Sequence, residues 1–234
     1  GQLQHGENYA TAYLRTIGLK IDQPRPFKKW PYKKGSPVKL FILAGHRNME
    51  GERAFVQELQ QLKGHQALLK SNPNIAFKYS LGGSYHVSKG WEPLGLTGYY
   101  DTFGPELSFA RTITTAEPGN IAIAKFTHSG SQIIDWTPEG SPAKSRHVYP
   151  KFIQFVKQSV QELTAKGHAV EVAGIFYHVG ENDMSFHPYR RDAAARVQAI
   201  MNQSRKDLAL PKLNWYVSQQ SPTDVERLNQ LDVV

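Results

Sequence analysis

The chain has 234 residues, of which 40% are hydrophobic and 21% charged, with no cysteine and a formal net charge of +8. This length suits one well-buried α/β domain and is short for two, and the lack of cysteine excludes disulfides, thiolate catalysis and zinc–sulfur sites. No apolar run approaches the roughly 20 residues that span a bilayer, and the polar residues 1–10 do not form a signal-peptide pattern, so no membrane contact is predicted.

Residues 1–37 are predicted to form an extended polar arm, with one short helix at about residues 8–17. Within the arm, residues 25–34 alternate cations with aromatics and prolines. This pattern is compatible with a nucleic-acid or acidic-polysaccharide contact, but we favour a solvated lead-in to the first strand. No RNA- or DNA-binding motif accompanies it, so nucleic acid is not a predicted partner.

Residues 38–234 are predicted to form one α/β domain. Strands are expected at residues 38–43, 74–80, 120–126, 170–177 and 213–218, and helices at 52–69 (interrupted near Gly64), 105–113, 149–166 and 188–208. Residues 81–104, rich in glycine and aromatics, are predicted to be a long surface loop. Because strands alternate with helices, the fold class is α/β: a three-layer, doubly wound parallel sheet of flavodoxin-like type.

Three of the predicted strands end in polar residues that are capable of chemistry. The first leads into residues 45–50, the third into 127–131 and the fourth into 178–183. Since the carboxyl ends of parallel strands share one edge of a sheet, we expect these turns to converge on one pocket.

Four segments resemble motifs of the SGNH hydrolases, in particular the sialate O-acetylesterase-like carbohydrate esterases. Gly-Gln-Ser-Asn-Met of that family is matched by Gly-His-Arg-Asn-Met at 45–49, and Trp-His-Gln-Gly-Glu-Ser-Asp by Tyr-His-Val-Gly-Glu-Asn-Asp at 177–183. Residues 91–95 with 103–110, and residues 129–136, are similar to the other two motifs. The similarity runs in order from about residue 38 to 218 and implies an SGNH-hydrolase fold.

The resemblance implies an O-acetylesterase acting on glycans, with a serine nucleophile in the first turn, oxyanion donors from glycine and glutamine, and a histidine in a later Asp-x-x-His. Here Arg47 stands at the serine position and Val179 at the glutamine. The Asp-x-x-His segment is not found, so we expect the domain to lack it. A guanidinium is not a nucleophile, and losing the serine costs about 10⁴- to 10⁶-fold in rate. Ordinary serine esterase chemistry is therefore not supported, and the sequence leaves enzymatic activity open.

The candidate site is drawn from the three turns and from the motif at 91–95 with 103–110. The candidate catalytic positions are Arg47, Gly104, His178 and Glu181; the candidate substrate-binding residues are His46, Asn48, Trp91, Ser129, Ser131, Asn182 and Asp183. The two serines are alternative nucleophiles with His128 or His178 as base, although such serines more often bond to backbone in a tight turn. Glu181 and Asp183 are expected either to position His178 or to pair with Arg47.

Several functions remain alternatives. The protein is either a family esterase with a degenerate site or a non-catalytic domain that binds an acylated or anionic glycan, in which Arg47 captures the anion and Trp91, Tyr99, Tyr100 and Trp136 stack on sugar rings. A third hypothesis is an interaction domain whose last strand contacts a partner segment or a second copy. A metal site from His46, His178, Glu181 and Asp183 is disfavoured because Arg47 would repel a cation, so no metal or cofactor is predicted. The resemblance implies export, secreted or periplasmic.

Overall fold

The central element of the fold is strand β1 (Pro37–Gly45), which is buried on both faces. The computed structural model describes residues 26–98, 101–142 and 146–218, so the helix predicted at 8–17 lies outside the described residues. Along β1, Leu40 and Ile42 belong to one hydrophobic core, and Phe41 and Leu43 to the other. Because both faces are apolar, the strand requires a covering layer on each side.

The sheet has seven strands and is mostly parallel. Its order is β3-β2-β5-β1-β6-β7, and β4 pairs with β2. The other strands are β2 (Asn72–Leu81), β3 (His86–Val87), β4 (Glu92–Leu94), β5 (Asn120–Thr127), β6 (Ala169–His178) and β7 (Trp215–Val217). All five predicted strands are confirmed. The two short strands β3 and β4 run antiparallel to β2, so the segment predicted as one long loop is partly built into the sheet.

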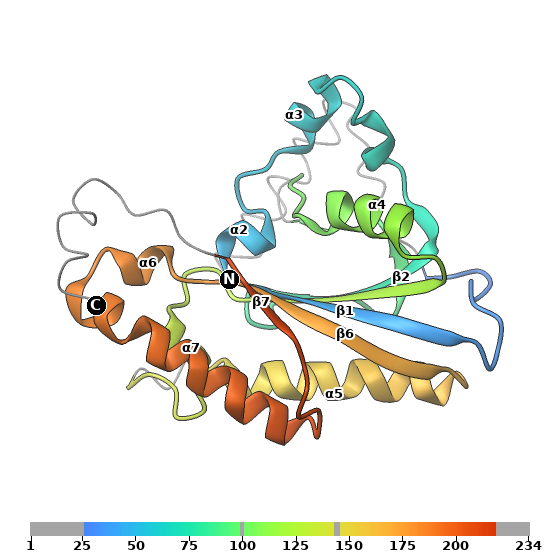
Figure 1. The fold of residues 1–234 in the computed structure, drawn as a ribbon. Helices are drawn as coiled ribbons and strands as arrows, with labels where there is room; N and C mark the ends of the chain where they lie inside the picture. Colours follow the sequence, from blue (N-terminus) through green and yellow to red (C-terminus); the bar gives the residue numbers. More distant parts are fainter. Residues whose placement is uncertain (1–25, 99–100, 143–145, 219–234) are drawn as a thin grey trace.

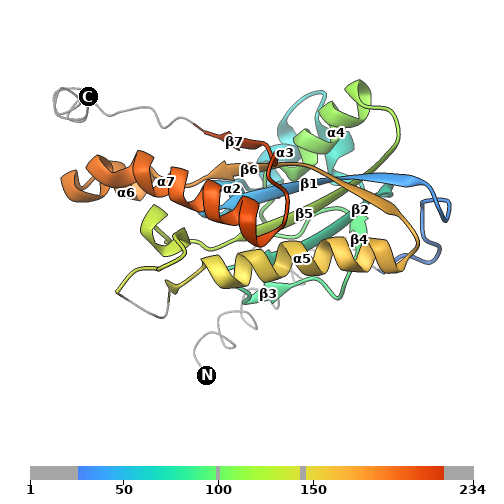
Figure 2. The same ribbon diagram turned by 60° about the horizontal axis from the view of Figure 1, so that its bottom comes forward.

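Helices cover both faces of the sheet and make three layers. Figure 1 shows α3 (Val56–Gln61) and α4 (Glu106–Ala116) on one face, and α5 (Tyr149–Ala165) and α7 (His187–Asp207) on the other. In Figure 2, α5 and α7 lie in front of the sheet. The doubly wound α/β fold is thus confirmed. None of the described helices is long and apolar enough to cross a membrane.

The helix predicted at 52–69 is shorter than its pattern indicated. The chain is helical only over α3 and in a 3₁₀ turn at Gln66–Leu69. Its apolar spacing is interrupted after α3, where Leu62 takes an extended conformation with ψ of 107°. Two helices of four residues, α2 (Arg47–Glu50) and α6 (Glu181–Met184), follow β1 and β6 in segments that the sequence identified only as turns.

The register of the sheet brings the three polar turns to one edge. Gly45, the last residue of β1, pairs with Thr127 of β5 on one side and with His178 of β6 on the other. A Cβ atom at Gly45 would lie 2.4 Å from the His178 carbonyl oxygen and 2.7 Å from the Met49 Cβ. Glycine therefore permits the close approach of β1, β6 and α2 on which the site is built.

Candidate functional site

The first turn enters α2 directly from β1 and is held tightly against the segment before α4. His46 precedes the helix with its side chain fully buried. Gly51 ends the helix with φ of +92°, and a Cβ there would lie 1.9 Å from the Phe103 carbonyl oxygen. Only glycine fits this left-handed, crowded position. Along this turn His46 is buried, Arg47 is half-buried and Asn48 is exposed.

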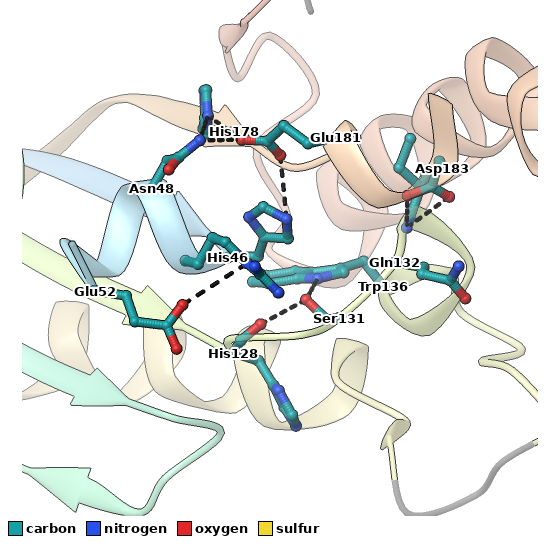
Figure 3. A network of polar contacts seen from close by, with 12 residues as sticks. His46, Asn48, Glu52, His128, Ser131, Gln132, Trp136, His178, Glu181 and Asp183 are labelled. Atoms are coloured by element: carbon teal, nitrogen blue, oxygen red, sulfur yellow. Dashed lines mark hydrogen bonds and ion pairs between the residues drawn. The ribbon is translucent and has the colours of Figure 1, made fainter. Parts of the chain in front are cut away.

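Glu181 of α6 is the centre of the polar cluster (Figure 3). Its Oε1 lies 2.8 Å from Nε2 of His178, and its Oε2 lies 3.1 Å from Nε2 of His46. Asn48 donates from Nδ2 to the same Oε1 and lies 3.3 Å from the His178 Nε2. One carboxylate thus joins two imidazoles and an amide from the ends of β1 and β6.

Burial and charge set the protonation of this cluster. Burial raises the pKa of Glu181. The hydrogen bond with His178, a backbone hydrogen bond and the charges of both histidines outweigh this effect and lower the pKa to about 2. Burial lowers the pKa of His46 below its usual value of 6.5, and Glu181 only partly opposes this. At neutral pH, Glu181 is a carboxylate and the His46 ring is neutral. Neither ring nitrogen of His46 has an aligned hydrogen bond in the described part of the chain.

Arg47 lies at the rim of the cluster. Its side chain is 40% exposed, and its Nε lies 3.7 Å from Oε2 of Glu52. The structure therefore pairs Arg47 with Glu52, which the sequence had not singled out, whereas Glu181 holds the histidines. In the sequence, Arg47 stands where the motif that residues 45–49 resemble has its serine.

In the turn after β5, the buried Ser131 makes hydrogen bonds that stabilise the turn. Ser131 donates from Oγ to the His128 carbonyl oxygen at 2.7 Å and accepts from Nε1 of Trp136 at 2.9 Å. Nδ1 of His128 lies 3.0 Å from the carbonyl oxygen of Ser129, which is half-buried. Within the described residues, no hydroxyl of this turn is hydrogen-bonded to an imidazole. The arrangement of Ser131 matches the backbone-bonding alternative.

Asp183 anchors α6 to the turn after β5. Its carboxylate is fully buried, and both oxygens lie 3.1 Å from the backbone N of Ile133, which donates to them (Figure 3). Burial raises the pKa of Asp183 to about 6, although the hydrogen bonds from Ile133 and the charge of Arg196 oppose the shift. Asn182, between the two acidic residues, is half-buried. Asp183 is therefore placed to position a turn.

The backbone N–H of Gly104 is already hydrogen-bonded to a member of a buried ion pair. The backbone N of Gly104 donates to Oε1 of Glu106 at 3.2 Å, and Lys125 contacts the other carboxylate oxygen at 2.6 Å, with both charged side chains fully buried. Lys125 also donates to the Glu50 carbonyl oxygen at 3.0 Å. The glycine amide that the resemblance assigned to the oxyanion hole thus faces a carboxylate. Sequence reasoning missed this pair; the only signal was a lysine within the apolar run at 120–126.

The tryptophans predicted to stack on sugars lie in the core. Trp91 is 7% exposed, and Trp136 is fully buried against Phe126 and Tyr177. Their rings fill core volume and do not face solvent, while Tyr99 and Tyr100 lie outside the described residues. The exposed aromatic beside the cluster is instead Tyr216 of β7, at 52%, which the sequence analysis did not select.

A cavity of about 420 Å³ adjoins the cluster at the ends of β6 and β7. Its lining includes Asn48, Met49, Phe176, His178 and Tyr216. It thus combines an apolar wall with polar side chains, among them Asn48, His178 and Ser218, as small-molecule sites commonly do. Among the described residues, no group of three or more histidines and carboxylates is arranged to hold a metal ion.

Comparisons with known proteins agree with this architecture. A family model described as "Carbohydrate esterase, sialic acid-specific acetylesterase" matches residues 37–231. No curated protein matches the chain.

Similar solved structures include a protein from Arabidopsis thaliana, with 20% identity over 86% of this chain and 82% of that one and a TM-score of 0.59. NanS shares 17% identity over 86% of this chain and 72% of its own, with a TM-score of 0.57. A carbohydrate acetylesterase from Xanthomonas citri shares 16% identity over 76% of this chain but only 41% of its own, with a TM-score of 0.54. These likenesses show a shared fold, and the family match covers most of the chain. The chain therefore belongs to the family of sialic acid-specific acetylesterases among the carbohydrate esterases.

Proposed function

We propose that this domain binds an acyl-substituted sugar of a glycan at the carboxyl edge of its sheet, without forming an acyl-serine intermediate. Family membership supports a carbohydrate ligand. The observation that carries the proposal is the 420 Å³ cavity, because it joins the exposed ring of Tyr216 to the polar side chains of Asn48 and His178. The volume lies within the usual range for small-molecule pockets.

Tyr216 supports the sugar-binding part of the proposal. Its ring stacks on Phe176 with centroids 4.6 Å apart and planes inclined by 12°. One face of the ring is therefore packed, and the 52% exposure of the side chain leaves the other side accessible. Exposed aromatic rings present large apolar contact area at little conformational cost. The C–H face of a sugar is the expected partner for such a ring.

The charges at the rim favour a neutral substituent over an anionic one. Arg47 is already paired with Glu52, and the carboxylate of Glu181 lies beside the cavity residues Asn48 and His178. A sulfate or uronate would have to displace one carboxylate while it is repelled by another. An O-acyl group carries no charge and meets neither cost.

Two observations support the part of the proposal that excludes an acyl-serine intermediate. Arg47 stands at the serine position of the motif and cannot act as a nucleophile, and the Ser131 hydroxyl is held between Trp136 and the backbone of His128. An acyl-serine intermediate requires a hydroxyl within hydrogen-bond reach of a base, which neither residue provides.

Isothermal titration with partially acetylated xylo-oligosaccharides and with O-acetylated sialic acid tests the proposal, with the deacetylated sugars in parallel. We expect saturable binding of an acetylated probe that falls by about tenfold in Tyr216→Ala and in Asn48→Ala. Phe55→Ala is the matched control, since this aromatic is 45% exposed and precedes α3. Binding only of sulfated oligosaccharides, lost in Arg47→Ala, would favour anion capture instead. No binding of any probe would reject the proposed function.

A further inference from the structure

The two imidazoles beside Glu181 differ in what they can reach. His46 is fully buried, and its Nε2 faces the Glu181 carboxylate at 3.1 Å. His178 is half-buried and lines the 420 Å³ cavity. Of the two rings, only His178 can therefore meet a ligand bound in the cavity.

The hydrogen bond with Glu181 orients the His178 ring. Its Nε2 lies 2.8 Å from Oε1, a distance typical of a bond between an imidazole N–H and a carboxylate. We assign the proton to Nε2 from this bond, so the lone pair is on Nδ1. Glu181 remains ionised because its pKa is lowered to about 2, and it can stabilise the imidazolium that forms when Nδ1 accepts a proton. Such a pair is the arrangement expected of a general base and its orienting carboxylate.

We propose that His178, oriented by Glu181, is a general base that activates a water molecule for direct attack on the ester of a bound acyl sugar. The inference rests on the proposed function, since it requires the acyl sugar to be bound in the cavity. It assigns to this site a hydrolysis that needs neither a serine nucleophile nor a covalent intermediate.

The step balances with water as the only co-reactant. The water oxygen forms a bond to the acyl carbonyl carbon while one of its protons passes to Nδ1 of His178. The tetrahedral intermediate then collapses, the bond between the carbonyl carbon and the sugar oxygen breaks, and the proton passes from His178 to that oxygen. The products are the free carboxylic acid and the sugar hydroxyl.

The adjoining turn supplies a donor for the negative charge that develops on the carbonyl oxygen. Asn48 lines the same cavity, and its side-chain amide carries a second N–H besides the one that it donates to Glu181. Donors fixed near a developing oxyanion stabilise it without reorganisation. In this proposal the Asn48 amide takes the place of the Gly104 amide, which donates to Glu106.

Acetate release from the acetylated probe that binds in the titrations tests this assignment. We expect a rate above the uncatalysed hydrolysis, a loss of about 10²-fold in His178→Ala, and a loss of about tenfold or more in Glu181→Gln. His187→Ala is the matched control, because this exposed histidine begins α7. Added imidazole should partly restore His178→Ala, which a merely structural histidine would not allow, and unchanged circular dichroism would show that each variant is folded.

Three further results decide the route. A serine-directed fluorophosphonate should neither inhibit nor label the protein, and intact-mass spectra during turnover should show no acyl adduct. A burst of product with an acyl adduct, or an undiminished rate in His178→Ala, would overturn the proposal. Saturable binding with no hydrolysis would overturn the role of His178 as a base and leave the proposed function standing. If the unaltered protein binds none of the probes, both the proposed function and the role of His178 are rejected.

Discussion

The Nε2 atom of His46 lies 3.1 Å from Oε2 of Glu181, and the imidazole is completely buried. This contact ties the end of β1 to the helix that follows β6. His46 lies on the buried side of the Glu181 carboxylate, and His178 lies on its cavity side. The carboxylate is therefore a structural joint as well as the orienting group of the proposed base, and its protonation should alter stability.

Replacement of Glu181 by glutamine should remove a stabilising contribution that depends on pH. The folded pKa of about 2 lies below the usual 4.5, so this contribution is complete above pH 4.5 and is lost as the pH falls towards 2. At neutral pH we expect Glu181→Gln to lower the free energy of unfolding by on the order of 2 kcal/mol, with the difference shrinking in acid. Urea unfolding at pH 7 and pH 3 measures it. Glu139→Gln, at an exposed glutamate, is the control, and a pH-independent difference would contradict the expectation.

The effect of Asp183 on stability should depend on pH in the opposite direction to that of Glu181. Its folded pKa of about 6 lies above the usual 3.8, mainly because of burial, so its contribution to stability declines as the pH rises from about 4 to 6. Asp183→Asn keeps an acceptor for the Ile133 amide but carries no charge. We expect the variant to gain stability relative to the unaltered protein over this window, by on the order of 2 kcal/mol.

Thermal unfolding at pH 4 and pH 7 measures the change. Asp183→Ala serves as the comparison, because it leaves the buried Ile133 N–H without its acceptor and should cost about 1–3 kcal/mol at both pH values. A stability of Asp183→Asn that follows the unaltered protein at both pH values would show that the carboxylate does not titrate there.

The convergence of the polar turns could be predicted because it depends only on the pattern of apolar residues along the chain. Near-continuous apolar runs identified parallel strands, and parallel strands bring their carboxyl ends together. The pairing of Gly45 with Thr127 and His178 in the sheet shows this convergence. The same reasoning placed His46 and Glu181 at one edge but did not say which atoms meet.

The partners of charged residues could not be predicted. Apolar spacing shows which face of an element is buried, but not which side chain from another element will neutralise a charge on it. The sequence analysis therefore gave Lys125 no partner, although it contacts Glu106 in the core. Trp91 looked like a binding residue because it lies in a glycine-rich segment, yet it fills core volume. Tyr216 gave no signal, since exposure depends on β7 being the edge strand.

The ion pair of Lys125 and Glu106 provides a third prediction. Both side chains are fully buried with 2.6 Å between Nζ and Oε2, so removing one partner leaves an uncompensated charge. We expect Lys125→Met alone or Glu106→Leu alone to cost about 3–5 kcal/mol of unfolding free energy. The double variant should cost clearly less than the sum, because the remaining apolar groups no longer bury a charge. Urea unfolding of all four proteins measures the coupling, and strict additivity would show that the two charges do not interact.

Gly45 provides the last prediction, because it sets the distance between β1 and β6 at the site. A Cβ at this position would lie 2.4 Å from a backbone oxygen of His178, which cannot move aside as a side chain can. Gly45→Ala should therefore force the strands apart, weaken the 3.1 Å bond from the His46 amide to that oxygen, and cost about 1–3 kcal/mol. Gly35→Ala is the informative comparison: it precedes β1, has φ of +83° and has open space around it, so it should cost about 1 kcal/mol from backbone strain. If the site depends on the spacing of the strands, thermal unfolding will detect both changes, but titration with the acetylated probe will detect only Gly45→Ala. Equal losses of binding in the two variants would mean that binding follows overall stability and not the geometry of this edge.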